Sequence, residues 1–263
     1  MRRRCGAFAL AAGLGAAAAP AVAGDMARAE VIGFSVDGAF VAVEEYGVQD
    51  GSGSFYSAIE VLDVAADRPV DGARVAVLLD YEAMTEAERD DGLAMARAQA
   101  RAAAAPTLAA SGIVDGNAGT LVIARPPSDL DAPPHTVRMS LGAAFNPYWM
   151  QDREVLQLTE RPADAPDCPD YGEPPMLFAL TLTLDEGATV ALHDDTALPA
   201  ARGCPTGYRI HSVIAYLPGL PSQAECCRGR TTALLVLVQL TRPGFEGPDW
   251  RFVPVTAVVE GMP

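Results

Sequence analysis

The strongest constraint on the fold is a succession of short apolar segments separated by glycine, proline and other turn residues. They lie at residues 31–35, 40–46, 58–64, 74–80, 120–124, 136–141, 154–159, 177–184, 189–193, 209–217, 232–241 and 251–259. Segments of this length and spacing are typical of an all-β fold rather than of alternating βαβ units. The chain is therefore predicted to be mainly β, with the run TTALLVLVQL at 231–240 as a buried strand.

One segment departs from this pattern and predicts a helix. The run TEAERDDGLAMARAQARAAAA places Thr85 and Glu88 at the spacing of a capping box, and arginines toward its end complement the helix dipole. The sequence predicts one inserted helix at about residues 86–105, ended by Pro106. Its apolar stripe is thin, so we expect it to cover one side of the β-structure; a partner-binding helix is the alternative.

Two architectures fit these elements, a propeller-like arrangement and a β-sandwich. At about 40 to 45 residues per blade, about 240 residues would hold about five blades, and the helix reduces that number. The propeller-like arrangement is the first interpretation, and a β-sandwich or an incomplete propeller is the alternative. In either case we expect residues 24–263 to form a single β-rich secreted domain.

The stretch FSVDGAFVAVEEY contains the clearest local signal, Asp37 and Gly38 between two apolar runs. Asp-Gly at this place predicts a β-hairpin, because glycine accepts the positive φ of a tight turn. Residues 31–65 resemble one repeat of the TolB-type WD-like propeller proteins, with Val36 where that repeat commonly has proline. A second good copy of the turn is not found.

A wider resemblance covers most of the chain. The strings GFSVDGAFVAVEEYGVQDGSGS, DTALPAARGCPTGYRI and TRPGFEGPDWRFVPVT are similar to those of a family of bacterial predicted secreted proteins that carries a domain-of-unknown-function label. That family has no established activity. The resemblance therefore implies export and a shared architecture, and it transfers no catalytic residue.

The first residues predict export. MRRR is followed by an apolar run and by Ala21-Val22-Ala23, a small-x-small cleavage site, so residues 1–23 are interpreted as a signal peptide; an N-terminal membrane anchor is the alternative. No later apolar run approaches the roughly 20 residues of a transmembrane helix. We therefore expect a periplasmic or extracellular protein with no membrane span after signal cleavage.

The charge of the mature chain restricts its partners. Three of the 19 basic residues lie in MRRR, which leaves 16 arginines against 34 Asp and Glu, a net charge of −18. Phosphate recognition depends on clustered cations, so nucleic acid and anionic lipid are disfavoured. An unknown protein, peptide or envelope component is the expected partner.

The cysteines of an exported protein are expected to form disulfide bonds, because disulfides persist outside the cytoplasm. Cys168, Cys204, Cys226 and Cys227 remain after cleavage. The favoured pairing joins Cys168 and Cys204 each to one of the adjacent two. The alternative joins Cys168 to Cys204 and leaves a vicinal redox-active pair, and no spacing matches a common zinc or thioredoxin pattern.

Two glycine-rich acidic loops form the candidate binding site. Residues 41–64 align without gaps with residues 235–258, so the loops around Asp50 and Glu246 are expected to project on one rim. The oxygen donors of these loops could engage a partner, or they could hold calcium, which prefers several oxygen ligands. These donors are Asp50, Ser52, Ser54, Glu246 and Asp249. DGSGS lacks the later glutamate of an EF-hand, and glycine with serine is also ordinary loop chemistry.

The sequence offers little for catalysis. It has no G-x-S-x-G, H-E-x-x-H, phosphate-binding loop or dinucleotide fingerprint. A binding or interaction module of the bacterial envelope is therefore the favoured interpretation. The alternative is a hydrolase-like enzyme using His193 or His211 with Asp194 or Asp195 as an acid/base group. For each histidine the preferred interpretation is an ordinary strand or surface residue whose polar groups are satisfied locally. No cofactor other than calcium is expected.

Overall fold

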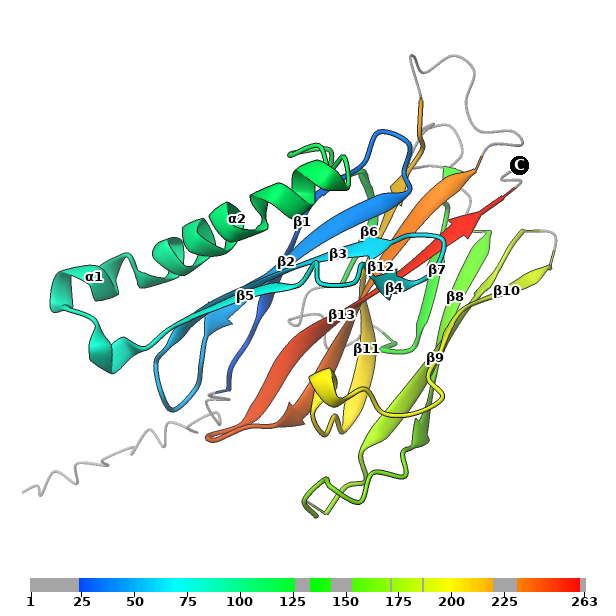
Figure 1. The fold of residues 1–263 in the computed structure, drawn as a ribbon. Helices are drawn as coiled ribbons and strands as arrows, with labels where there is room; N and C mark the ends of the chain where they lie inside the picture. Colours follow the sequence, from blue (N-terminus) through cyan, green and yellow to red (C-terminus); the bar gives the residue numbers. More distant parts are fainter. Residues whose placement is uncertain are drawn as a thin grey trace, which may run out of the picture.

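The structure is a computed structural model that describes residues 24–125, 133–142, 153–170, 172–185, 187–219 and 231–260. Residues 1–23, with the predicted signal peptide, and Cys226 and Cys227 lie outside the described residues. Figure 1 shows three antiparallel β-sheets stacked in layers, with a helical segment over the first of them.

The N-terminal sheet has the order β1-β2-β3-β4, and β5 also pairs with β3. Its strands are β1 (Arg28–Phe34), β2 (Phe40–Val48), β3 (Phe55–Asp63), β4 (Arg68–Pro69) and β5 (Val75–Leu79). The turn between β1 and β2 is the predicted Asp-Gly hairpin: Gly38 has φ 73°, and Ser35 N donates to Phe40 O at 2.9 Å.

The central sheet has the order β13-β12-β11-β6, and the outer sheet has the order β10-β9-β8-β7. The strands of the central sheet are β6 (Thr120–Ala124), β11 (Gly207–Tyr216), β12 (Thr232–Pro243) and β13 (Pro248–Val259). Those of the outer sheet are β7 (Thr136–Met139), β8 (Glu154–Pro162), β9 (Met176–Thr183) and β10 (Thr189–Asp194).

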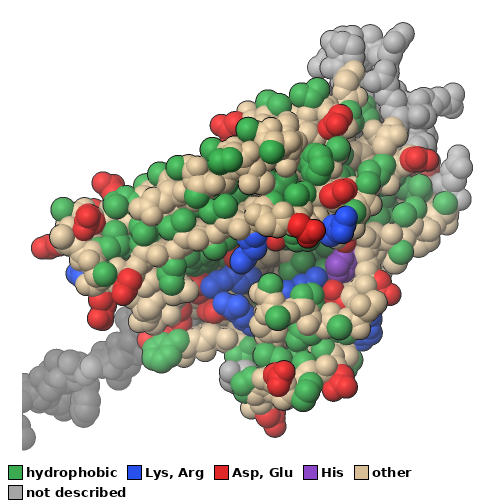
Figure 2. All heavy atoms as spheres, in the orientation of Figure 1, with side chains coloured by type: hydrophobic (Ala, Val, Ile, Leu, Met, Phe, Trp, Pro, Cys, Tyr) green, Lys and Arg blue, Asp and Glu red, His purple; other side chains and the backbone are tan. Residues whose placement is uncertain are grey.

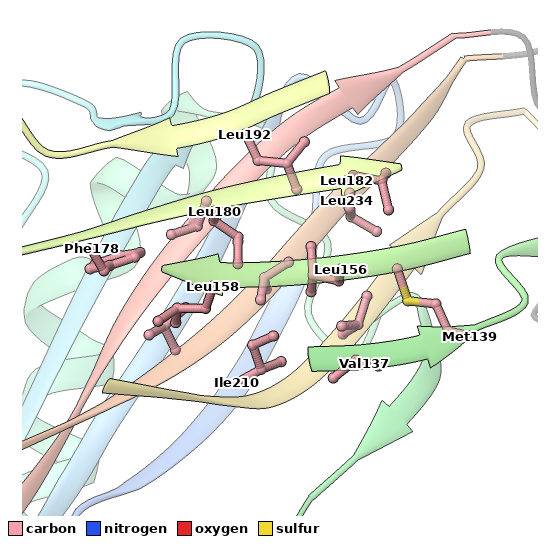
Figure 3. Close-up of a cluster of buried hydrophobic side chains, with 14 of the residues drawn as sticks. Val137, Met139, Leu156, Leu158, Phe178, Leu180, Leu182, Leu192, Ile210 and Leu234 are labelled. Atoms are coloured by element: carbon pink, nitrogen blue, oxygen red, sulfur yellow. The ribbon is translucent and has the colours of Figure 1, made fainter. Parts of the chain in front are cut away.

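The central sheet is covered on both faces. Alternate residues of β12 pack on opposite sides: Leu234, Val236 and Val238 against the outer sheet, Leu235 and Leu237 against the N-terminal sheet. Figure 3 shows the side chains that meet between the central and outer sheets. Residues 232–240 are all buried, so the prediction of a buried strand is confirmed, and the length of this apolar run follows from its two covered faces.

The predicted helix consists of two helices, α1 (Glu86–Asp90) and α2 (Gly92–Ala110). The capping box of Thr85 and Glu88 is confirmed. The chain bends at Asp91, and Gly92 lets α2 approach β3 closely, since a Cβ at Gly92 would lie 2.2 Å from the Phe55 ring.

The prediction that Pro106 ends the helix is wrong, because α2 continues to Ala110. Leu108 and Ile113 pack against the core on the helix side of the N-terminal sheet, and Ile113 N donates to Leu108 O at 2.9 Å. This packing offsets the hydrogen bond that proline cannot make. The helix covers the face of β3 and β5 turned away from the central sheet.

The mainly β prediction is confirmed, and the stacked sheets form a sandwich-like architecture. Each predicted apolar segment overlaps an observed strand, and β4 is the strand that was not predicted. The propeller resemblance of residues 31–65 is not supported. Those residues form three neighbouring strands of one layer, packed face to face on the next sheet rather than placed radially as a blade.

Two smaller elements complete the described fold. The 3-10 helix η1 (Tyr81–Ala83) connects β5 to α1, and η3 (Ala200–Arg202) lies between β10 and β11. Among the described residues, no helix is long and apolar enough to cross a membrane.

Candidate functional site

A cleft of about 580 Å³ opens between the N-terminal sheet, the edge of β13 and the η3 segment. Its walls contain consecutive residues of three strands, 56–58 of β3, 76–78 of β5 and 251–254 of β13, while Pro199, Ala201 and Arg202 close one end. Figure 2 shows this hollow below the upper layer, with arginine side chains gathered inside it next to a histidine.

The lining of the cleft is more basic than the rest of the protein. Its charged side chains are the cations Arg74, Arg202, Arg242, Arg251 and His193, and the carboxylates Glu45, Glu60 and Asp67. The chain as a whole has a net charge of −15. Asp25, Asp195 and Asp249 pair with these cations from outside the lining, so the cations, rather than their partners, are the groups that an anionic ligand in the cleft would meet first.

The four arginines differ in how far their charge is already compensated. Arg251 is paired with the buried Asp25, and Arg202 Nη1 lies 2.6 Å from Asp195 Oδ2. Arg242 Nε lies 3.4 Å from Asp249 Oδ2, a longer contact. Arg74 is exposed and forms no ion pair with any other residue that the structure describes.

Carboxylates hold both ring nitrogens of His193. Nδ1 lies 2.6 Å from Asp67 Oδ2, and Nε2 lies 2.9 Å from Asp195 Oδ1. The ring stacks on Phe178 with centroids 4.7 Å apart. Asp67 sits at the turn after β3 with φ 46°, a left-handed conformation that aspartate tolerates better than most residues. His193 therefore links the outer sheet to the N-terminal sheet across the cleft.

This arrangement keeps the imidazole charged. Burial lowers the pKa of His193, but hydrogen bonds to Asp195 and Asp67 outweigh it and raise the pKa to about 9. Burial raises the pKa of Asp195, and the hydrogen bonds from His193, Phe178 N and Arg202 lower it to about 2. An imidazolium with both N–H groups donated has no lone pair for a general base.

The other residues of the catalytic hypothesis do not join this cluster. Asp194 is exposed and pairs with Arg161 at 2.9 Å. His211 stacks edge-on against Phe252, and its Nδ1 lies 3.3 Å from Ser212 Oγ. Burial and the nearby Arg209 lower the pKa of His211, which keeps it neutral, and His211 forms no ion pair with a carboxylate of the described residues.

A second buried cluster anchors the start of the described chain to β13. Asp25 accepts a hydrogen bond from Tyr56 Oη at 3.0 Å and pairs with Arg251, whose guanidinium also lies 4.9 Å from the Tyr56 ring centroid. Trp250 N donates to Asp25 O at 2.8 Å. Burial raises the pKa of Tyr56, so its hydroxyl stays protonated and donates. These contacts fix the Arg251 side of the cleft.

The two predicted rim loops do lie side by side. Glu246 N donates to Asp50 Oδ2 at 2.9 Å, and the exposed Phe245 lies against Gly51. Gln49, which begins the first loop, lines the cleft, so the rim adjoins its mouth.

The structure does not bring all five candidate oxygen donors together. Ser52 Oγ bonds Gln49 at 3.1 Å, Ser54 is buried beneath the loop, and Asp249 receives the N–H of Asp25 at 3.2 Å besides facing Arg242. Within the described ranges, no group of three or more His, Cys, Asp or Glu is placed to hold a metal ion. Calcium binding stays a prediction, which thermal unfolding at millimolar calcium tests.

The disulfide joins Cys168 to Cys204, so the favoured pairing with the adjacent cysteines is wrong. The Cys168–Cys204 bond of the alternative is present, while the predicted vicinal pair of Cys226 and Cys227 lies outside the described residues. Cys204 comes two residues after Arg202, and the bond closes a sequence separation of 36 residues. The segments after β8 and before β11 are brought together where the outer sheet packs on the central sheet, and Met176 N donates to Pro205 O there at 2.7 Å. The spacing of cysteines alone does not reveal this arrangement. The bond restrains the η3 wall of the cleft.

Sequence reasoning missed Asp67 and the cleft arginines. Asp67 lies 126 residues from His193, and no local pattern marks it. Arginine is the basic residue throughout this lysine-free chain, so an individual arginine carried no signal. The alternation of β3 is the signal that could have helped, because it puts Tyr56, Ala58 and Glu60 on the face of the N-terminal sheet that lines the cleft.

The comparisons with known proteins support a family and no individual relative. Neither the curated proteins nor the solved structures contain a match to the chain. A family described as "Predicted secreted protein (DUF2259)" matches residues 42–258, which include β3, β5, β13 and η3, the elements of the cleft. The family description agrees with export to the periplasm or the extracellular space. With most of its length matched, the chain belongs to this family of predicted secreted proteins.

Proposed function

We propose that this protein is an exported binding protein that engages its partner in the cleft between the N-terminal sheet and β13. The observation that carries the proposal is a cavity of about 580 Å³ with a basic lining in an acidic protein. Concave sites with apolar walls and a few convergent polar groups are where proteins bind ligands. Here Leu78, Ala58 and Pro254 supply apolar wall, and the arginines supply the polar groups.

Binding is favoured over hydrolysis by the state of His193. Its two nitrogens are held by Asp67 and Asp195, and its role is to connect two sheets. A hydrolase would need a base with a free lone pair next to a substrate-sized space. The cleft arginines, in contrast, lie where a partner could reach them, and the rim loops at Asp50 and Glu246 extend the same surface.

Capture from a periplasmic extract tests the proposal. The double variant Arg74→Ala/Arg242→Ala removes the two guanidinium groups with the least compensated charge. Its matched control is Arg28→Ala/Arg138→Ala, which removes the same charge from exposed residues outside the cleft. We expect the cleft variant to lose a partner that wild type and the control retain, with an affinity at least tenfold weaker in direct titration.

Two outcomes would contradict the proposal. Equal capture by the cleft variant and the control overturns the proposal. Loss of capture by Asp50→Ala/Glu246→Ala alone places the partner on the rim loops rather than in the cleft. Matched melting temperatures are required of all variants, so that a loss of binding is not a loss of folding.

A further inference from the structure

Two strand edges face the cleft, one from each of the sheets that bound it. Ala76, Val77 and Leu78 are consecutive residues of β5, and 252–254 are consecutive residues of β13. β5 pairs with β3 alone, and β13 pairs with β12 alone, so each of these strands has one side without a neighbouring strand. Backbone hydrogen-bonding groups of both edges are therefore within reach of a ligand.

The outward N–H positions of β13 are blocked from Trp250 to Thr256. Every second N–H points away from β12, and in this part of the strand these positions are Trp250, Phe252, Pro254 and Thr256. Trp250 N donates to Asp25 O at 2.8 Å, Phe252 N to Glu45 Oε2 at 2.6 Å, and Thr256 N to Asp67 Oδ1 at 2.7 Å. Pro254 has no N–H. Carboxylates and a proline are the means by which proteins protect strand edges from pairing.

The edge of β5 has no such protection. Its sequence, VAVLL, contains no charge and no proline. Within the described part of the chain, no hydrogen bond engages the outward N–H or C=O groups of residues 75–79. The helix α2 covers the face that Val75 and Val77 share, while Leu78 on the cleft side is 58% exposed. An apolar edge left open in this way is a template for a further strand.

Charge indicates what kind of strand fits. Arg74 directly precedes β5, and Arg202 and Arg242 stand across the cleft from it as parts of the same lining. A second copy of this strongly acidic chain would meet electrostatic repulsion. A short extended segment that carries carboxylates would instead meet the cationic lining.

We propose that the cleft binds an extended acidic peptide, which adds as a strand to the open edge of β5 and places its carboxylates near Arg74, Arg202 and Arg242. This inference rests on the proposed function and names its ligand class. Main-chain hydrogen bonds to β5 give affinity, and alternate side chains of the peptide enter the cleft beside Leu78. Three features support it together: one open edge, one blocked edge opposite it, and a basic lining between them.

The free protein gives the first test. In amide hydrogen exchange followed by NMR, we expect alternate amides of residues 75–79 to exchange rapidly, while those of Phe252 and Thr256 are protected by their carboxylate acceptors. Protection of all five β5 amides in the free, monomeric protein would overturn the proposal, because the edge would then already be occupied.

Peptide binding gives the second test, with a displayed library of random nonapeptides selected on the wild-type protein as the probe. We expect the selected peptides to be acidic and to protect β5 amides from exchange. N-methylation of alternate backbone amides of the peptide should lower the affinity at least tenfold on the edge that pairs with β5 and have no such effect on the other edge. Leu78→Glu should weaken them at least tenfold. Leu121→Glu on β6, where the leucine is 59% exposed, is the matched control and should leave affinity unchanged.

The two proposals fail differently. Strand addition is overturned if peptides bind more weakly to Arg74→Ala/Arg242→Ala but tolerate N-methylation at every amide. It is also overturned if such peptides leave the β5 amides unprotected. In both cases the cleft remains a binding site. If no selected peptide distinguishes wild type from the cleft variant, strand addition is also overturned. Capture from extract, which makes no assumption about peptides, then decides the proposed function by itself.

Discussion

His193 and Asp67, separated by 126 residues in the sequence, are joined by a contact of 2.6 Å between Nδ1 and Oδ2. The contact links β10 of the outer sheet to the turn after β3 in the N-terminal sheet, and Asp195 completes it at Nε2. Asp67 also accepts from Thr256 N, so three sheets meet at one carboxylate. The cluster is therefore a junction of the layers.

The first prediction is a pH dependence of stability that His193 controls. Its folded-state pKa is raised from 6.5 to about 9, so the stabilisation is complete below pH 6.5 and is lost as the pH rises through 9. The shift corresponds to about 3 kcal/mol. Urea unfolding should show the stability difference between wild type and His193→Asn shrinking across this window.

Asp195 and His211 provide the checks on this interpretation. The pKa of Asp195 is lowered from 3.8 to about 2, so its contribution is present above pH 3.8 and lost as the pH falls through 2, outside the His193 window. His211→Asn should leave the slope between pH 7 and 9 unchanged, because burial already keeps that ring neutral there. An identical slope in His193→Asn and wild type would contradict the prediction.

The second prediction concerns Glu44, which ties α2 to the N-terminal sheet. Its carboxylate is fully buried and receives Arg97 Nε at 2.9 Å, Arg101 Nη2 at 2.8 Å and Ser57 Oγ at 2.9 Å. Burial raises the pKa of Glu44, but these hydrogen bonds lower it below its usual value, so it is ionised. Glu44→Ala should lower the free energy of unfolding by about 3 kcal/mol, measured in urea, because it removes the buried carboxylate that Arg97 and Arg101 share and leaves them only exposed partners.

Glu30→Ala is the matched control, because Glu30 contacts the same two arginines. Its side chain is 45% exposed, and its contact with Arg101 Nη2 is 3.0 Å. An exposed ion pair contributes at most about 1 kcal/mol. Equal losses in Glu30→Ala and Glu44→Ala would mean that burial does not set the strength of this network.

Much of the fold could be predicted from local signals. Short apolar segments between turn residues located the strands, because a strand that packs into the core carries an apolar face. The Thr85 and Glu88 spacing located the helix start, because a capping box is a local hydrogen-bond arrangement. Neighbouring side chains of a strand point to opposite faces, and the structure accordingly has Glu44 of β2 facing α2 and Glu45 facing β13.

The stacking of sheets and the site could not be predicted in the same way. The propeller and the sandwich use similar strands, and the difference lies in which faces meet. The contact of Arg251 with Asp25 spans 226 residues, and that of Thr256 with Asp67 spans 189. Such pairs depend on tertiary arrangement, which a single sequence does not encode in any local spacing. The disulfide partner of Cys168 was mistaken for the same reason.

The third prediction concerns the disulfide between Cys168 and Cys204. Opening a loop of 36 residues by Cys168→Ser/Cys204→Ser should cost about 4 kcal/mol through the entropy of the unfolded chain. Urea unfolding of the oxidised wild type and the double variant measures this loss. Non-reducing peptide mapping should find Cys168 linked to Cys204, and the link should persist in Cys226→Ser/Cys227→Ser. A peptide joining Cys168 to either adjacent cysteine would refute the pairing.

The fourth prediction separates the two carboxylates that block β13. Glu45→Ala should speed hydrogen exchange at the Phe252 amide by at least tenfold and leave Thr256 unchanged, whereas Asp67→Ala should do the reverse. A hydrogen bond to a charged acceptor contributes about 1.5 to 3 kcal/mol, which corresponds to tenfold or more in exchange. Since each variant serves as the control for the other, a general loosening of the protein is recognised by faster exchange at both amides. Unchanged exchange at Phe252 in Glu45→Ala would mean that β13, like β5, offers an open edge to the cleft.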